Sequence, residues 1–240
     1  MSEMSNREAI DAWAAGGSHV GDFGDEGDFT RRYLLNPAIF ALLGSVAGHK
    51  ILDVGCGQGY LCRLLAKHGA IVTGVEPAEP WYKDAVEREC RDALGITYLQ
   101  ADLSTLTHLP TAFDAVVANM VLMDIPDYAG ALRNCIGLLR TGGSLIFSLL
   151  HPCFEEPGAE WAPKGYVAVR EYLQEHVRQQ SFAPLFHRPL SRYLNLVIQE
   201  GGSLRQILEP GLGPEWANHG PAYERNVYVP SVIVVHAVKV

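Results

Sequence analysis

The 240-residue sequence has little that would place it in a membrane or on nucleic acid. No stretch approaches the roughly 20 apolar residues that a membrane-spanning helix needs, and the first residues lack the basic and apolar regions of a secretion signal. Lysine and arginine total 19 against 27 acidic residues, a formal charge of −8. Proteins that follow phosphate backbones usually carry a basic face. We therefore expect neither a membrane nor a nucleic-acid partner.

Paired cysteines and metal-ligand motifs are missing as well. The five cysteines are odd in number, and the sequence contains neither C-x-x-C nor H-E-x-x-H. This usage excludes a disulfide framework and a zinc ribbon as simple interpretations. We expect reduced thiols, a cytoplasmic protein and no metal ion.

The order of apolar segments after Lys50 indicates an α/β protein. Short β-branched runs at 51–54, 70–75, 96–101, 113–119 and 144–150 predict strands, and apolar spacings of three and four predict helices at 58–68, 79–94 and 126–140. This alternation favours an open, mostly parallel sheet with helices on both faces. Thr141 to Gly143 predict a tight turn before the fifth strand. A helix near 189–200 and strands at 204–208 and 229–238 complete the prediction.

Two segments interrupt this alternation. Residues 1 to about 35 mix glycines with acidic residues between Trp13 and Tyr33, which predicts either a lid over a site or a solvated tail. Residues 152 to about 190 are rich in proline and aromatic residues, among them Phe182, and long insertions in compact domains usually serve function. We expect one domain: a lid segment (1–48), a cofactor-binding core (49–151), a substrate-side insertion (152–200) and closing strands (201–240).

The most specific segment runs from Ile51 to Gly69, ILDVGCGQGYLCRLLAKHG. A strand leads through three glycines into a helix, an arrangement in which the backbone approaches a ligand closely. Glu76 ends the next predicted strand, where a carboxylate can accept hydrogen bonds from ribose hydroxyls. A dinucleotide fingerprint would need glycine where Tyr60 stands, and a P-loop would need G-K-[ST]. Asp53 suits a cationic ligand better than a pyrophosphate.

The segment ILDVGCGQG resembles the first motif of class I S-adenosylmethionine-dependent methyltransferases, (V/I)LD(V/I)GCGxG. The resemblance continues in order from Lys50 to Leu150. It implies a Rossmann-like fold of seven mostly parallel strands with an antiparallel last strand, S-adenosylmethionine as cofactor and S-adenosylhomocysteine as product. By this resemblance Glu76 binds the ribose and Asp102 the adenine amino group. The implied cofactor-binding residues are Asp53, Gly55, Cys56, Gly57, Gly59, Tyr60, Glu76, Pro77, Asp102, Leu103, Asn119 and Met120. Tyr33, Phe29 and Trp13 are candidates to cover the cofactor, because aromatic faces attract a sulfonium, and ordinary packing against the first helices is the alternative.

Methyl transfer from a sulfonium is an in-line displacement, and a hydroxyl or ammonium acceptor must lose a proton. His151 is the candidate base because it follows the fifth predicted strand at the edge where such sheets bind ligands, and His187 is a second candidate. The alternative for each is an ordinary histidine without a catalytic role, at a strand end in the case of His151. Cys153 is a nucleophile that this reaction does not need.

The function that we favour is methylation of a small acceptor, and an aromatic or alkaloid-like metabolite fits better than a phosphate-rich one. We expect the acceptor to lie beneath the lid, the insertion and an aromatic loop near Trp216, His219 and Tyr223. Base methyltransferases of nucleic acids commonly carry [DNS]-P-P-[YFW] after the fourth strand, where this chain reads Asn119-Met120-Val121-Leu122. The alternatives left open are methylation of a protein or RNA, a non-catalytic cofactor-binding protein and a nicotinamide-dependent oxidoreductase. We expect a monomer or a homodimer.

Overall fold

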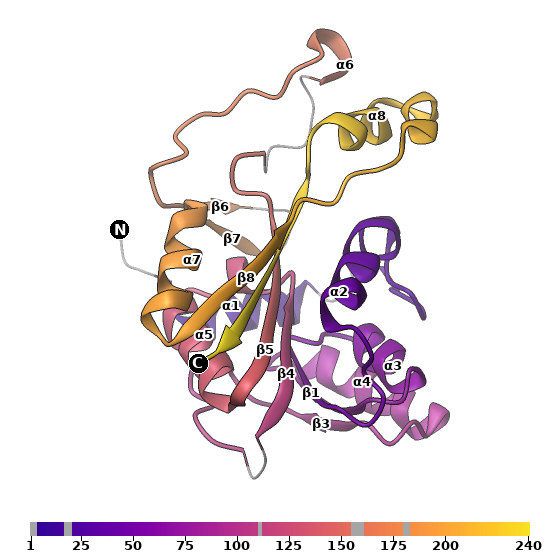
Figure 1. Cartoon of the computed structure of the whole chain (residues 1–240), viewed down its shortest axis with the longest axis vertical. Helices are drawn as coiled ribbons and strands as arrows, with labels where there is room; N and C mark the ends of the chain where they lie inside the picture. Colours follow the sequence, from indigo (N-terminus) through magenta and orange to yellow (C-terminus); the bar gives the residue numbers. More distant parts are fainter. Residues whose placement is uncertain (1–3, 17–20, 110–111, 155–160, 180–182) are drawn as a thin grey trace.

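The computed structural model describes residues 4–16, 21–109, 112–154, 161–179 and 183–240. Among these, seven strands form one sheet in the order β3-β2-β1-β4-β5-β9-β8 (Figure 1). Neighbouring strands from β3 to β5 pair in parallel, and β9 pairs antiparallel with both β5 and β8. The predicted Rossmann-like fold is confirmed. The strands are β1 (Lys50–Val54), β2 (Ile71–Val75), β3 (Thr97–Leu99), β4 (Phe113–Asn119), β5 (Leu139–Leu150), β8 (Gly202–Leu208) and β9 (Val232–Lys239).

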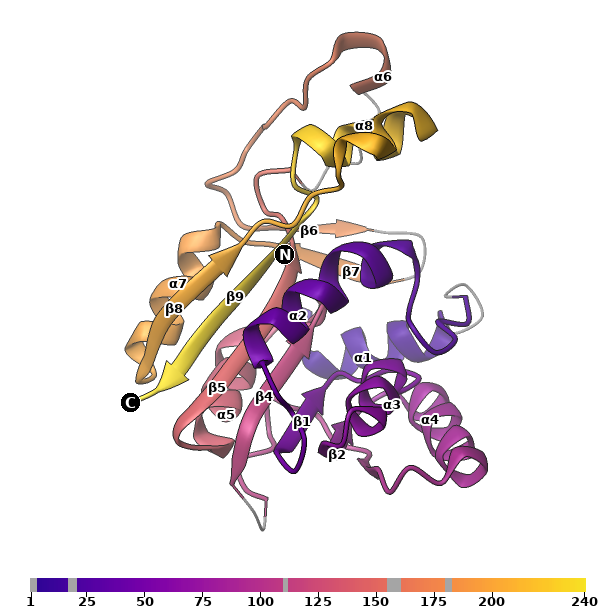
Figure 2. The same cartoon turned by 45° about the vertical axis from the view of Figure 1, so that its right-hand side comes forward.

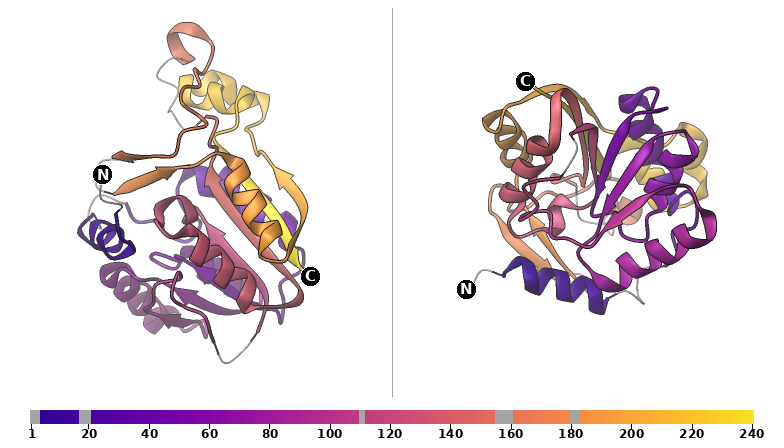
Figure 3. Two further views of the ribbon diagram at one scale, coloured as in Figure 1. Left: turned by 90° about the vertical axis from the view of Figure 1, so that its left-hand side faces the viewer. Right: turned by 90° about the horizontal axis from the view of Figure 1, so that it is seen from below.

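Helices cover both faces of the sheet, as seen end-on in the right panel of Figure 3. Successive strand residues point to opposite faces, so Ile51 packs in the cluster that contains α2 (Asn36–Leu43) and α3 (Tyr60–Lys67). Its neighbour Leu52 packs in the cluster that contains α5 (Tyr128–Leu138) and α7 (Leu190–Gln199). Both side chains are fully buried, and truncating such a residue to alanine typically costs about 2–5 kcal/mol.

The predicted turn at Thr141 to Gly143 is wrong. β5 begins at Leu139, directly after α5 ends at Leu138, because Leu139 already pairs with Phe113 of β4 and is buried. The extra residues form an irregularity inside the strand, where the register with β4 shifts and Gly142 adopts φ 75°. A buried apolar contact thus extends the strand past the local glycine signal.

The amino-terminal segment packs against the core. α1 (Asn6–Ala15) begins at a capping box in which Ser5 and Glu8 bond reciprocally. Residues 21–30, here called the strap, lead into a π-helix, η2 (Arg31–Leu35), and then α2. α1 lies in contact with α4 (Glu79–Asp92), as Figure 2 shows. Residues 17–20 of the predicted lid lie outside the described residues.

The insertion after β5 contains α6 (Trp161–Lys164) and a two-stranded sheet of β6 (His176–Gln179) and β7 (Pro184–His187). Between β8 and β9 lie η4 (Pro214–His219) and α8 (Pro221–Tyr228). Trp161 stacks on Tyr228, so α6 and α8 lie together at one end of the molecule (Figure 1). Phe182 lies outside the described residues. Across the described ranges, no helix is long and apolar enough to cross a membrane.

Candidate cofactor and acceptor site

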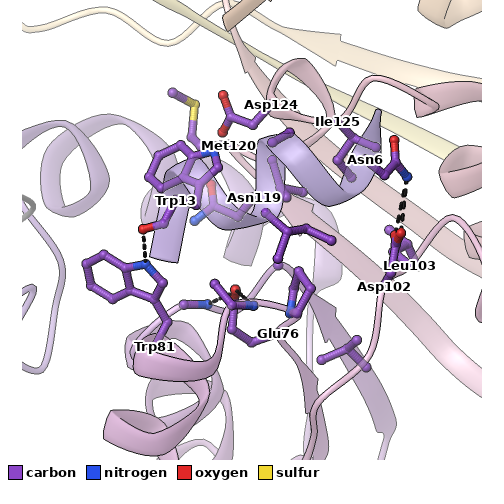
Figure 4. Close-up of a pocket in the computed structure, with 18 of the residues that line it drawn as sticks. Asn6, Trp13, Glu76, Trp81, Asp102, Leu103, Asn119, Met120, Asp124 and Ile125 are labelled. Atoms are coloured by element: carbon purple, nitrogen blue, oxygen red, sulfur yellow. Dashed lines mark hydrogen bonds between the residues drawn. The ribbon is translucent and has the colours of Figure 1, made fainter. Parts of the chain in front are cut away.

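A cavity of about 510 Å³ lies where β1, β2 and β4 end, between the sheet and α1 (Figure 4). Its volume is within the usual range for small-molecule sites. The wall is formed by α1, the strap with the start of η2, the ends of β1, β2 and β4, the start of α4, and the segments that follow β3 and β4. The lining residues include Asn6, Trp13, Phe23, Arg31, Gly55, Gly57, Glu76, Pro77, Trp81, Asp102, Leu103, Asn119, Met120 and Asp124.

The glycine loop forms one side of the cavity with a left-handed backbone. Gly55 and Gly57 have φ 64° and 54°, a region that side-chain-bearing residues rarely adopt. A Cβ on Gly55 would collide with Val121, whereas a Cβ on Gly57 would meet no protein atom within 4 Å. Because Gly57 lines the cavity, that open space is room for a ligand against the backbone.

Glu76, at the end of β2, is held by the glycine loop itself. Its two carboxylate oxygens accept hydrogen bonds from the backbone N–H groups of Gly57 and Ala78, each at 2.9 Å. Burial raises the pKa of Glu76 to about 7, although the two N–H groups favour the charged form. Each carboxylate oxygen keeps a second lone pair, so Glu76 can accept further hydrogen bonds from a ligand.

Asp102 lies at the opposite end of the cavity from Asp124, beside Leu103 (Figure 4). Asn6 of α1 donates to its carboxylate at 3.2 Å, and Ser104 donates through both its backbone N–H and its hydroxyl. Asn6 also accepts a hydrogen bond from the backbone N–H of Asp127. One side chain of the lid therefore connects α1 to two loops that border the cavity.

The end of β4 is fixed by a chain of side-chain hydrogen bonds behind the wall. Asn119 donates to the hydroxyl of Tyr60 at 2.6 Å and accepts from Ser148 at 2.7 Å. Met120 follows with φ 61°, and its backbone N–H donates to Ser148. A non-glycine residue in this conformation stores strain, and such residues cluster at functional sites.

The strap docks on the core through buried polar contacts and surface ion pairs. The guanidinium of Arg63, 1% exposed, donates to the carbonyls of Gln58 and Gly24 at 2.7 Å each. Asp22 pairs with Arg88 and Asp25 with Lys67, each at 3.0 Å. The acidic run is thus bound to the core, and the lid interpretation of this segment fits the structure better than a solvated tail.

Trp13 and Trp81 connect the lid to α4. The indole N–H of Trp81 donates to the carbonyl of Trp13 at 3.1 Å, and both rings line the cavity (Figure 4). The sequence offered Trp13 as a candidate cover for the cofactor, but it gave no signal for Trp81 or for the hydrogen bond between the two residues.

Several predicted cofactor residues stand outside the wall. Asp53 is buried behind the glycine loop, where it accepts a hydrogen bond from the thiol of Cys62 at 3.1 Å. Tyr60 belongs to the Asn119 network, and Tyr33 packs on Phe29 and Trp216 with 41% of its surface exposed. These side chains support the loop or the lid and do not face the cavity. The predicted residues outside the lining are Asp53, Cys56, Gly59, Tyr60 and Tyr33.

The two histidines proposed as bases are also outside the wall. His151 is buried, its Nε2 donates to Glu209 at 2.7 Å, and its Nδ1 accepts from the backbone N–H of Cys153. With both ring nitrogens engaged, it has no free site for an acceptor proton. His187 is buried in the insertion, where it stacks on His176 and donates to the carbonyl of Tyr172. The structure does not support either histidine as the base.

The acceptor space predicted beneath the insertion and the Trp216 loop is likewise corrected. Within the described residues, the cavity wall comes from positions 6 to 126, and nothing from 152 to 240 contributes. Trp216, His219 and Tyr223 pack on one another and on Phe29 of the strap. They support the outer side of the lid.

Among the residues described, no group of three or more His, Cys, Asp or Glu side chains is arranged to hold a metal ion. The prediction of a metal-independent protein stays a prediction.

Similarity to known proteins identifies the family of this chain. A family model described as a methyltransferase domain matches residues 52–147. A solved S-adenosylmethionine-dependent methyltransferase from Mesorhizobium loti is 30% identical, with a TM-score of 0.73, and the match covers 85% of this chain and 96% of that one. The chain belongs to the S-adenosylmethionine-dependent methyltransferase family, as the resemblance implied.

Two further proteins mark the limits of the similarity. A ubiquinone biosynthesis O-methyltransferase of Coxiella burnetii is 35% identical over 154 residues, which cover 59% of this chain and 64% of that protein. The chain thus spans less than two thirds of the length of this curated relative. The magnesium protoporphyrin IX methyltransferase of Synechocystis PCC 6803, solved with bound S-adenosylmethionine, has a TM-score of 0.63 over 100% of both chains, but 17% identity shows the fold alone.

The family cofactor is S-adenosylmethionine, and the cavity fits it. Gly57 leaves room against the backbone, Glu76 presents a carboxylate one strand away, and Asp102 presents another at the far end. Hydroxyl and amino groups of an adenosine are the donors that such carboxylates accept.

Proposed function

We propose that the protein transfers a methyl group from S-adenosylmethionine to a hydroxyl group of a small, largely apolar acceptor. The observation that carries the proposal is the cavity, which unites Gly57, Glu76 and Asp102 under a lid with aromatic side chains. The choice of a hydroxyl group is supported by the relatives, which are named ubiquinone biosynthesis O-methyltransferases.

In this proposal Gly55 and Gly57 let S-adenosylmethionine lie close to the backbone. Glu76 accepts hydrogen bonds from the ribose hydroxyls, and Asp102 and Leu103 hold the adenine. Asn119 and Met120 border the reacting end, and Pro77 lies beside the ribose. When bound, S-adenosylmethionine supplies an electrophilic methyl group on a sulfonium. The protein contributes by orienting the two reactants. Holding them in line can lower the activation free energy by on the order of 7–11 kcal/mol in the best cases.

The aromatic wall supports the apolar character of the acceptor. Trp13 and Phe23 come from the lid and Trp81 from α4, and all three line the cavity. Aromatic faces bury apolar ligands well and also attract a sulfonium cation. A phosphate-rich acceptor would find acidic side chains in this wall.

We further propose that the chain is a single cytoplasmic domain with a lid segment (1–48), a cofactor-binding core (49–151), an insertion (152–200) that stands outside the described cavity wall, and closing strands (201–240). It acts as a monomer or homodimer without a metal or a nucleic-acid partner. One sheet combines strands from Lys50 to Lys239, which supports a single domain. The five free thiols and the charge of −8 support the location and the lack of a nucleic-acid partner.

The test is transfer from isotope-labelled S-adenosylmethionine to catechol, phenol, benzylamine and thiophenol, in parallel with an extract separated by size. We expect label in the methyl ether of catechol or phenol. Label on benzylamine or thiophenol alone would contradict the proposal that the acceptor atom is a hydroxyl oxygen. Label only in extracted protein or RNA would replace the small acceptor with a macromolecule, and tight cofactor binding without transfer would favour a non-catalytic protein.

A further inference from the structure

The polar side chains of the cavity wall differ in how far the protein already satisfies them. Glu76, Asp102 and Asn119 are hydrogen-bonded as described, Asp22 pairs with Arg88, and Asp28 pairs with Arg31. Asp124 also lines the cavity, but among the described residues its carboxylate makes no hydrogen bond and no ion pair. Half-buried carboxylates rarely stay unpaired, so this group is available to a ligand that brings a hydrogen-bond donor.

The backbone around Asp124 is held from behind by a buried arginine. Asp124 ends a short 3-10 helix, η3 (Leu122–Asp124), immediately after the Met120 bend. The guanidinium of Arg188, 5% exposed, donates to the backbone carbonyls of Ile125 and Pro126 at 3.0 Å each. Its Nη1 also lies 3.4 Å from the backbone carbonyl oxygen of Leu122. Arg188 therefore fixes the loop on both sides of Asp124.

Asp124 lies at the end of the cavity where we expect the methyl group and the acceptor. Figure 4 shows its carboxylate at the end of the cavity where Met120 and Trp13 lie, away from Asn6 and Asp102. If the adenosine occupies the Glu76 and Asp102 side, the methyl group and the acceptor share the opposite end. No histidine lines the described wall.

We propose that Asp124 is a catalytic residue that binds the acceptor hydroxyl and takes its proton, and that Arg188 is its positioning residue. This inference rests on the proposed function, because it concerns the acceptor of that reaction. As the oxygen forms its bond to the methyl carbon, the carbon–sulfur bond breaks and its electron pair stays on sulfur. The hydroxyl proton moves to the Asp124 carboxylate, which later releases it to water.

The charges around Asp124 suit this role. Burial raises the pKa of Asp124 well above its usual value, and the positive charges of Arg31 and Arg188 oppose that rise. Arg31 comes from η2 with its partner Asp28, Arg188 follows β7, and α1 presents the uncharged Ala9, Ile10 and Trp13 to the cavity. A carboxylate with a raised pKa is a stronger base, and a base works best when its pKa lies near the working pH.

The test compares Asp124→Asn with wild type on catechol and on 4-nitrocatechol, whose acidic hydroxyl ionises in water near neutral pH. For catechol we expect kcat/KM to fall by roughly 10²–10⁴-fold. For 4-nitrocatechol above its pKa the loss should be small, because no base is needed. The pH profile of wild type on catechol should show a limb that rises through the pKa of Asp124, and the variant should lose it.

Three controls separate a chemical role from a structural one. S-adenosylmethionine affinity by calorimetry should be within a few-fold of wild type in Asp124→Asn. Glu87→Gln, an exposed carboxylate on α4, should leave rates unchanged. Arg188→Lys should lower kcat on catechol and flatten the same limb while the cofactor affinity stays. Carbon-13 NMR of the aspartate carboxyls should show a signal that titrates well above the usual range and is lost in Asp124→Asn.

Equal losses on both catechols, or no loss on catechol, would overturn the role of Asp124 while leaving the proposed function intact. A wild-type protein that binds S-adenosylmethionine and methylates no member of the acceptor panel would instead remove the proposed function, and this inference with it.

Discussion

At the scale of single residues, three carboxylates of the cavity wall differ in what holds them. Backbone N–H groups hold Glu76, Asn6 and Ser104 hold Asp102, and no described group bonds Asp124. The glycine motif and its spacing predict Gly57 and Glu76, and the family resemblance implies Asp102. Asp124 gave no local signal, since one acid after a strand is ordinary. Its importance depends on which neighbours leave it unpaired, and this is a property of the tertiary structure.

Glu76→Gln should weaken S-adenosylmethionine binding by roughly 10–100-fold, the effect of losing a hydrogen bond to a charged group. The amide NH2 of the variant would also face the N–H of Gly57 or Ala78. Because the pKa of Glu76 is raised to about 7 and the carboxylate is the accepting form, wild-type affinity should rise from about pH 6 to about pH 8. Calorimetry across this range checks both statements; a pH dependence that persists in the variant would contradict the second.

Gly55→Ala and Gly57→Ala should fail in different ways, although both force alanine into a left-handed backbone. Such strain costs on the order of 1–3 kcal/mol. Gly55→Ala adds a collision with Val121 and should unfold at lower urea than Gly57→Ala. Gly57→Ala should lose cofactor binding out of proportion to its stability, since its methyl group would stand in the cavity. Urea titration and calorimetry of the pair measure this split, and equal unfolding midpoints would contradict it.

At the scale of elements, the strap shows how burial decides which contacts matter. Its ion pairs with Arg88 and Lys67 lie at the surface, where such pairs contribute about 0–1 kcal/mol. The guanidinium of Arg63 is buried, its hydrogen bond to Gln58 is buried and that to Gly24 is partly buried, and bonds from a charged donor are worth about 1.5–3 kcal/mol each. The acidic residues of the strap can be recognised in the sequence, but the role of Arg63 on α3 in holding the strap cannot.

Arg63→Met should therefore destabilise the protein by about 3 kcal/mol and release the strap, because the buried carbonyl of Gln58 and the partly buried carbonyl of Gly24 lose their donor. Hydrogen exchange of the amides from Gly21 to Gly27 should become faster than in Arg91→Met, a change of an exposed arginine on α4. Identical exchange in the two variants would mean that Arg63 does not hold the strap.

The predicted strands and helices show the same division between local and distant information. The glycine loop fixes where β1 ends and α3 begins, and the prediction is close there. β5 begins at Leu139 instead of Ser144 because Leu139 pairs with Phe113, a partner 26 residues away. The helix predicted at 126–140 is shorter for the same reason, since its last residues belong to that strand.

At the scale of the whole molecule, buried acids make stability depend on pH. The pKa values of Asp53 and Glu76 are raised to about 7 in the folded protein by burial, from ordinary values of 3.8 and 4.5 in the unfolded chain. The folded state thus holds protons that the unfolded state releases. The stabilisation from these protons is fully present below about pH 4 and is lost as pH rises to about 7.

The asparagine in Asp53→Asn cannot ionise, so this variant should lack the contribution of Asp53 to the loss of stability with rising pH. The free energy of unfolding of wild type, measured by urea without cofactor, should fall more steeply between about pH 4.5 and pH 7 than that of the variant. Parallel curves would show that Asp53 is ionised in the folded protein throughout this range.

The described cavity wall ends at Pro126, although the chain continues through more than a hundred residues of strands and helices. Those later residues support the sheet and build the outer end of the molecule around α6 and α8. An engineer therefore has two separate addresses in one chain. Under the proposed function, changes near Trp13, Arg31 and Asp124 would alter which acceptor is methylated, whereas fusions or labels near α8 would attach the protein to a carrier away from the cavity.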